Sequence, residues 1–166
     1  MSGKRSLLLL DRDGVLNRER GMHTWEPADF EILPGVAPAL LAASAAGFRF
    51  AVITNQSGIG LGLYGHEEVR ELHGMLRHHL AGNGVRLDDV LYCPHHPSRG
   101  RCLCRKPGSL LVERALARAR IDAADAWFIG DRERDMEAAI GAGVRGLRIE
   151  PNSDLRTAVD QILGEP

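Results

Sequence analysis

The sequence predicts an α/β protein with a Rossmann-like fold, in which helices cover both faces of one parallel sheet. Short apolar runs alternate along the chain with helical patterns, which is typical of βαβ units. Each apolar run ends in polar residues or glycine, as expected for strands buried on both faces. A length of 166 residues suits one domain, which we place at residues 1–166.

The strands are expected at residues 7–10, 48–53, 90–92, 126–130 and 146–149. Helical patterns fill the intervals at residues 36–46, 67–80, 109–119 and 133–142. A last amphipathic pattern follows Pro151, and we expect that stretch to be peripheral. Because the longest intervals between strands are filled by single helical patterns, we expect no large cap domain.

The composition is that of an ordinary globular protein, with 44% hydrophobic and 26% charged residues. With 21 Lys and Arg against 22 Asp and Glu, the formal charge is −1. Such a chain has no overall field that would attract nucleic acid or an acidic membrane. The N-terminus lacks a signal-peptide pattern, so we expect a cytoplasmic protein. We also expect a monomer.

Carboxylates stand directly after two of the predicted strands. Asp11 and Asp13 follow the first strand, and Asp131 follows the fourth. In a parallel sheet, ligands bind beyond the carboxyl ends of the strands, and these residues would share that edge. One carboxylate can attack while its neighbour transfers a proton, and both can hold a hard cation. Asp-x-Asp also occurs in plain turns, and Asp131 could instead cap a helix.

Groups suited to phosphate appear at two further places. The segment Thr54-Asn55-Gln56-Ser57-Gly58 follows the second strand and offers a hydroxyl, two amides and a turn. Lys106 lies in a later loop, where its ammonium could balance a phosphoryl group. Either segment alone would be consistent with an ordinary loop. Asp135 could support this site or lie exposed on its helix.

This order of carboxylate pair, hydroxyl, lysine and third carboxylate resembles the haloacid dehalogenase (HAD) superfamily of phosphatases. The resemblance runs from Leu7 to about Ile149. It implies an aspartyl-phosphate mechanism with Mg²⁺ and a small phosphorylated metabolite as substrate. The implied catalytic residues are the nucleophile Asp11, the general acid/base Asp13, and the phosphate-stabilising Thr54 and Lys106. The implied magnesium ligands are Asp11, Asp13 and Asp131, and the expected substrate-binding residues are Asn55, Gln56, Ser57, Arg105 and Arg132.

All three cysteines lie between positions 93 and 104, where they form Cys-x-His and Cys-x-Cys pairs. Cys93, His95, Cys102 and Cys104 would make a complete tetrahedral shell for Zn²⁺. With no position left for water, such a zinc ion would be structural. His96 is an alternative to His95, and free thiols in a loop are an alternative to zinc.

Within the superfamily, this insertion before Arg105 resembles the group containing heptose bisphosphate phosphatases and histidinol-phosphate phosphatases, both of which carry zinc here. The first expectation is removal of the 7-phosphate from D-glycero-D-manno-heptose 1,7-bisphosphate. The alternative is histidinol phosphate, which the short loop favours. A polynucleotide 3′-phosphatase is more remote, because no aromatic residue between Tyr92 and Trp127 could stack on bases. A non-enzymatic zinc module would leave the carboxylates and Lys106 unexplained.

The rest of the site is expected to come from loops. The segment 17–30, with its polar residues Glu19, Arg20, His23 and Trp25, is the expected rim of the substrate site. Four histidines on or beside the second helical pattern are expected to be exposed polar residues; they are His66, His73, His78 and His79.

Overall fold

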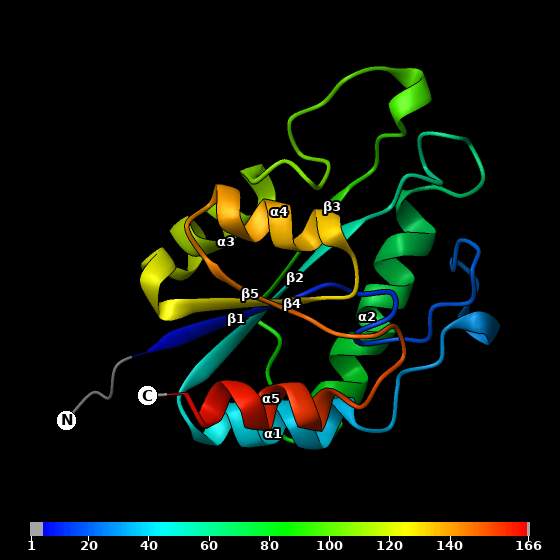
Figure 1. Cartoon of the computed structure of the whole chain (residues 1–166). Helices are drawn as coiled ribbons and strands as arrows, with labels where there is room; N and C mark the ends of the chain where they lie inside the picture. Colours follow the sequence, from blue (N-terminus) through cyan, green and yellow to red (C-terminus); the bar gives the residue numbers. More distant parts are fainter. Residues whose placement is uncertain (1–4, 166) are drawn as a thin grey trace.

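The computed structural model describes residues 5–165 and contains one five-stranded sheet (Figure 1). The strands lie in the order β3-β2-β1-β4-β5, and every neighbouring pair is parallel. Their bounds are β1 Ser6–Leu10, β2 Phe48–Asn55, β3 Asp89–Cys93, β4 Ala126–Gly130 and β5 Arg145–Arg148. The central strand is therefore β1, which delivers Asp11 to the middle of the carboxyl edge.

Helices cover both faces of the sheet, as the sequence predicts. One face carries α1 (Val36–Ala45), α2 (His66–Gly82) and α5 (Leu155–Leu163), and the other carries α3 (Leu110–Ala119) and α4 (Glu133–Gly141) (Figure 1). Side chains alternate along β1, because successive strand residues point to opposite faces. Leu8 and Leu10 join the first apolar core, whereas Leu7 and Leu9 join the second. Three short 3₁₀ helices lie at Pro27–Asp29, Pro97–Arg99 and Ala123–Asp125.

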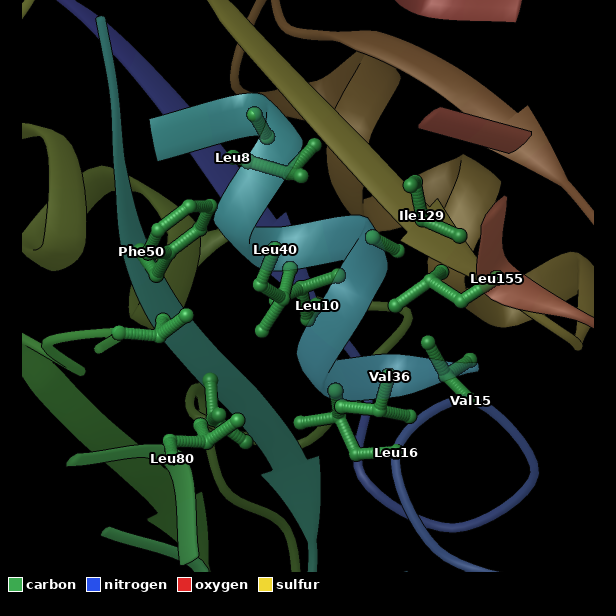
Figure 2. Packing of buried hydrophobic residues seen from close by; sticks show 14 of the residues in the cluster. Leu8, Leu10, Val15, Leu16, Val36, Leu40, Phe50, Leu80, Ile129 and Leu155 are labelled. Carbon is green, nitrogen blue, oxygen red and sulfur yellow. The ribbon is translucent and has the colours of Figure 1, made fainter. Parts of the chain in front are cut away.

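The C-terminal helix is part of the core, so the expectation that this stretch is peripheral was wrong. Leu155, Val159 and Ile162 of α5 are buried in the first core, and α5 packs along α1. Figure 2 shows Leu155 beside this core, with Leu40 of α1 lying against Leu10 of β1. The apolar stripe of an amphipathic helix must be covered, and α1 supplies the surface that covers it.

The predicted elements are confirmed with shifts of a few residues at their ends. The strand β2 extends to Asn55, so Thr54 and Asn55 lie within its last residues rather than after it. The longest connections between the described strands and helices are residues 11–35 and 94–109, each with a single 3₁₀ turn, and neither forms a cap domain. None of the helices in residues 5–165 is long and apolar enough to cross a membrane.

Candidate active site

A cleft of about 510 Å³ lies at the carboxyl edge of the sheet. Residues that follow or end three neighbouring strands line it: Asp11 after β1, Thr54 in β2 and Asp131 after β4. The other residues lining the cleft are Asp13, Glu19, Gly21, Met22, His23, Thr24, Asn55, Gln56, Ser57, Tyr64, Arg105, Arg132 and Arg134. The fold thus brings most of the predicted site residues into one cleft.

Lys106 does not itself line the cleft; it is buried between Asp11, which lines the cleft, and Asp135, which does not. Its Nζ lies 2.9 Å from Oδ1 of Asp11 and 2.7 Å from Oδ1 of Asp135, and donates to the carbonyl of Ile53 at 2.8 Å. The Asn55 side chain holds the Lys106 backbone through two hydrogen bonds of 3.1 Å. Asn55 therefore positions the loop that carries the lysine; it also lines the cleft, and its contact with substrate stays a prediction.

The carboxylates at the base of the cleft outnumber the buried cations beside them. Oxygens of Asp11, Asp131 and Asp135 lie within 4.8 Å of one another, and all three residues are buried. Burial raises the pKa of Asp11 to about 7, although the charge of Lys106 opposes that change. Burial likewise raises the pKa of Asp131. Oδ1 of Asp131 accepts no hydrogen bond from the described residues. A surplus of buried oxygen ligands of this kind fits a hard divalent cation such as Mg²⁺.

Asp13 is held differently from the other carboxylates. Its Oδ1 accepts hydrogen bonds from Arg12 at 3.0 Å and Asn17 at 2.9 Å, and its Oδ2 accepts one from Gln56 at 3.1 Å. Burial alone would raise the pKa of Asp13, but the Arg12 charge and these hydrogen bonds lower it overall. Asp13 is therefore an ionised, oriented carboxylate beside the cluster formed by Asp11, Asp131 and Asp135.

Gln56 connects several groups of the site through its side-chain amide. Its nitrogen donates to both Asp13 and Oγ1 of Thr54, the latter at 2.9 Å, and its oxygen accepts from Tyr64 at 2.9 Å. Gln56 and Thr54 are both buried. The Gln56 amide thus orients several protein groups, and because Gln56 also lines the cleft, its contact with substrate stays a prediction. Ser57 lines the cleft and is half-buried.

Gly14 is required where the first strand turns towards the cleft. Its φ is +89°, a left-handed conformation that side chains disfavour. A Cβ atom at this position would lie 2.5 Å from Oδ2 of Asp131. Glycine therefore lets the backbone after β1 approach the third carboxylate closely.

Three arginines line the cleft and give its mouth a positive charge. Arg132 lies 3.2 Å from Oδ2 of Asp131 and 3.7 Å from Glu19. Arg105 is half-buried and donates weakly to the carbonyl of His95 at 3.4 Å. Arg134 is exposed and has no carboxylate partner among residues 5–165. Cations of this kind suit a substrate group that carries negative charge away from the reacting centre.

The Cys and His side chains converge on one point in the loop after β3. One ligand atom from each of Cys93, His95, Cys102 and Cys104 lies within 4.8 Å of the others. The Cys93 and Cys102 sulfurs are 3.7 Å apart, and Nδ1 of His95 lies 3.5 Å from Cys93 and 3.3 Å from Cys104. Tetrahedral Zn²⁺ with ordinary bond lengths places its ligands about 3.5–3.8 Å apart. The cluster therefore fits zinc.

Of the two candidate histidines, the structure brings His95 to the thiols. The His96 ring instead accepts a hydrogen bond from the backbone N–H of Ser98 at 3.1 Å and contacts its hydroxyl at 2.7 Å. His96 thereby caps the short helix Pro97–Arg99.

Sequence reasoning missed a buried group beside Asp13. Arg12 is fully buried, and its guanidinium contacts His73, which is only 6% exposed. The expectation that His73 is an exposed polar residue was therefore wrong, whereas His66, His78 and His79 are exposed as expected. His73 lies on the buried face of α2 with Leu72 and Leu76, and that helical spacing was the signal available.

The expected rim contributes only part of its polar residues to the cleft. Glu19 and His23 line it. Arg20 pairs with Asp29 at 2.7 Å, and Trp25 stacks on Tyr64 with ring centroids 5.4 Å apart.

Comparison with known proteins agrees with this geometry. Residues 103–161 match the HAD-hydrolase-like family model. A D-glycero-β-D-manno-heptose-1,7-bisphosphate 7-phosphatase from Rhodopseudomonas palustris is 37% identical, over 98% of this chain and 92% of the relative. The enzyme of that name from Escherichia coli K12 is also 37% identical, over 82% and 74%.

A solved structure gives the same result. The D,D-heptose 1,7-bisphosphate phosphatase of B. bronchiseptica, complexed with magnesium and phosphate, superposes with a TM-score of 0.85 and 29% identity, covering 97% of this chain and 99% of that one. The chain therefore belongs to the HAD phosphatases, in the family that contains the D-glycero-β-D-manno-heptose-1,7-bisphosphate 7-phosphatases.

Proposed function

We propose that this phosphatase removes the 7-phosphate from D-glycero-D-manno-heptose 1,7-bisphosphate through an aspartyl-phosphate on Asp11. The observation that carries the proposal is the position of Asp11, whose carboxylate lies at the base of the cleft in contact with Lys106. Relatives that are 37% identical over most of this chain's length bear the name of that activity. In this proposal the catalytic residues are Asp11, Asp13, Thr54 and Lys106.

The first step transfers the phosphoryl group to the protein. The Lys106 ammonium and the Arg12 backbone N–H both contact Oδ1 of Asp11, so Oδ2 is the oxygen available for attack. A bond forms between this oxygen and phosphorus, the bond from phosphorus to the sugar oxygen breaks, and Asp13 gives its proton to the departing oxygen. Asp13 is ionised in the free protein, and the negative charge of an approaching phosphate favours its uptake of that proton.

The second step returns Asp11 to its starting state. A water oxygen bonds to phosphorus, its proton passes to Asp13, and the bond between phosphorus and Asp11 breaks to release inorganic phosphate. The hydroxyl of Thr54 offers a donor to the phosphoryl oxygens during both steps, and Lys106 contributes its positive charge beside Asp11. Asp13 thus alternates between acid and base, as is usual for one residue serving two proton transfers.

Two metal ions complete the proposal. Mg²⁺ at Asp11 and Asp131, with Asp13 as the third predicted ligand, would neutralise the repulsion between a carboxylate and a phosphate dianion. Zn²⁺ at the Cys and His cluster would hold the loop that leads into Lys106. The cytoplasmic location and the monomeric state remain predictions.

The charge of the cleft supports a bisphosphate over histidinol phosphate. Histidinol phosphate carries an ammonium group, which Arg105, Arg132 and Arg134 would repel. A second phosphate would be attracted to the same arginines, and a guanidinium can grip it with two hydrogen bonds. Arg105 is the first residue to test, because it directly precedes Lys106.

Rates of phosphate release from heptose 1,7-bisphosphate, the matching 7-monophosphate, histidinol phosphate and a 3′-phosphorylated oligonucleotide test the proposal. We expect the bisphosphate to give the highest kcat/KM. Arg105→Ala should erase much of its advantage over the monophosphate while leaving slow hydrolysis of p-nitrophenyl phosphate nearly unchanged. Faster hydrolysis of histidinol phosphate or the oligonucleotide by the unmodified protein would assign the enzyme to that substrate instead.

Asp11→Asn tests the covalent mechanism separately from the substrate. An amide cannot serve as the attacking carboxylate, so we expect no turnover of any substrate. The variant's sequence should be confirmed after purification, because Asn can deamidate back to Asp. Near-normal hydrolysis by confirmed Asp11→Asn protein would exclude an aspartyl-phosphate.

A further inference from the structure

We infer that Arg12 is a positioning residue, which orients the Asp13 carboxylate for proton transfer and fixes the rim segment 17–30 to that carboxylate. This inference rests on the proposed function, in which Asp13 transfers protons. Arg12 itself lines no part of the cleft and is fully buried, so it cannot contact the substrate directly.

The contacts of the guanidinium carry the inference. One terminal nitrogen of Arg12 donates to Oδ1 of Asp13 at 3.0 Å and to the carbonyl of Thr24 at 3.1 Å. That nitrogen has two hydrogens, so both bonds can exist together. The other terminal nitrogen lies 3.4 Å from Nε2 of His73. The guanidinium thus joins the catalytic loop, the rim segment and α2.

The donors on Asp13 are distributed unequally between its two oxygens. Oδ1 accepts from both Arg12 and Asn17, whereas Oδ2 accepts only from Gln56 among the described residues. An oxygen that already accepts two strong hydrogen bonds is a poor site for a further proton. The structure therefore assigns the transferred proton to Oδ2 and gives Arg12 the task of keeping Oδ1 turned away from the reacting atoms.

The charge balance around Arg12 supports the same conclusion. Burying a guanidinium is costly unless a carboxylate pairs with it, and Asp13 is the carboxylate in contact with Arg12. His73 contributes no negative charge, and the Phe30 ring lies 5.6 Å from the guanidinium carbon. A role in packing alone would not require the free-energy cost of burying a charged guanidinium. Orienting the Asp13 carboxylate does require a charged partner held in one position.

The test separates the two chemical steps with p-nitrophenyl phosphate. Its leaving group departs without a proton, so the burst of p-nitrophenolate in the first turnover does not need Asp13 as an acid. The later steady-state rate does need Asp13, because water must lose a proton to it. A positioning role therefore predicts that Arg12→Lys keeps the burst rate within about threefold of the unmodified enzyme and lowers the steady-state rate about 10- to 100-fold.

A second variant and a control keep the test decisive if Arg12→Lys folds poorly. His73→Leu removes the contact on the other side of the guanidinium and should lower the steady-state rate in the same direction, by less. Arg49→Lys is the control, since Arg49 pairs with Asp88 and the Ala119 carbonyl near the opposite edge of the sheet, and it should change neither phase.

Three outcomes would overturn the inference. These are an equal loss of burst and steady-state rates in both the Arg12 and His73 variants, no change in either rate, or a reduced burst with an intact steady state. Because the measurement uses a generic substrate, it can fail while the heptose assignment holds. Loss of the heptose assignment would likewise leave the burst comparison interpretable.

Discussion

The two candidate metal sites of this protein are built in opposite ways. The carboxylate cluster is buried, and Asp11 and Asp131 follow adjacent strands whose spacing the sheet fixes. The Cys and His cluster begins at Cys93, the last residue of β3, but its other members come from the loop that leaves the sheet (Figure 1). In that loop His95 is exposed and Leu103 is 81% exposed. The sheet thus holds the carboxylate cluster in place, whereas the geometry of the Cys and His cluster depends on a loop outside the sheet.

The largest effect is expected when the buried Lys106 ammonium is removed from the carboxylate cluster. Lys106→Met leaves Asp11 and Asp135 facing each other without the ammonium between them. We expect kcat/KM to fall about 10²–10³-fold, since a positioned charge at the reacting centre is removed. The free energy of unfolding without Mg²⁺ should also fall by about 3–5 kcal/mol, because buried charges lose their partner.

Steady-state kinetics and urea unfolding of the same Lys106→Met preparation would measure both effects. Saturating Mg²⁺ should recover part of the stability but not the rate. Kinetics equal to those of the unmodified protein would mean that activity does not depend on the Lys106 ammonium.

An intermediate effect is expected where the loop loses a predicted zinc ligand. His95→Ala should abolish zinc binding and lower both thermal stability and activity, because the loop into Lys106 is no longer fixed. His96→Ala, a matched control on the neighbouring residue, should retain about one zinc per chain. Metal analysis and thermal unfolding of the two variants give the comparison.

The presence of zinc can also be tested in the unmodified protein. Removing Mg²⁺ should stop turnover reversibly and leave the zinc in place. Protein purified without chelator that contains no zinc, and whose three thiols all titrate freely, would show that the cluster holds no metal.

The smallest effect concerns His73, the buried histidine that contacts Arg12 beside Asp13. Burial, reinforced by the charge of Arg12, lowers the pKa of His73 from 6.5 to about 3. Below pH 6.5 the unfolded chain binds a proton here and the folded protein does not, so stability is lost as pH falls towards 3. Through this residue alone, acidification from about pH 7 to about pH 5 should lower the free energy of unfolding by about 2 kcal/mol.

Urea unfolding as a function of pH checks this value. His73→Gln cannot titrate and should lose less stability on acidification than the unmodified protein. His78→Gln, on the exposed side of the same helix, should follow the unmodified protein. Equal acid sensitivity of all three proteins would show that His73 is not held neutral.

The elements, and most of the residues that the cleft brings together, could be predicted from the sequence because those signals are local. The run Leu7–Leu10 followed by Asp11 specifies a buried strand and its polar end within five residues. Cys93, His95, Cys102 and Cys104 were found in the same way, since one short segment holds them all.

The supporting contacts were missed because they are distant in sequence. Arg12 stands between two aspartates and looks like a surface charge, but Thr24 and His73 bury it from separate segments. The Gln56 amide contacts Tyr64 and Asp13, and no spacing rule connects these residues. The role of α5 in the core likewise depends on α1, which lies more than a hundred residues earlier in the chain.

The arrangement of charge along the cleft has a consequence for how substrate arrives. Guanidinium groups line its mouth and carboxylates lie at its base, so a phosphorylated anion meets attraction first and repulsion later. The arginines would raise the local concentration of such anions and speed their diffusional capture, an effect that salt screens over about 8–10 Å. The same field would slow the escape of the product, so ionic strength would govern association and release together while the proposed chemistry at Asp11 stays unchanged.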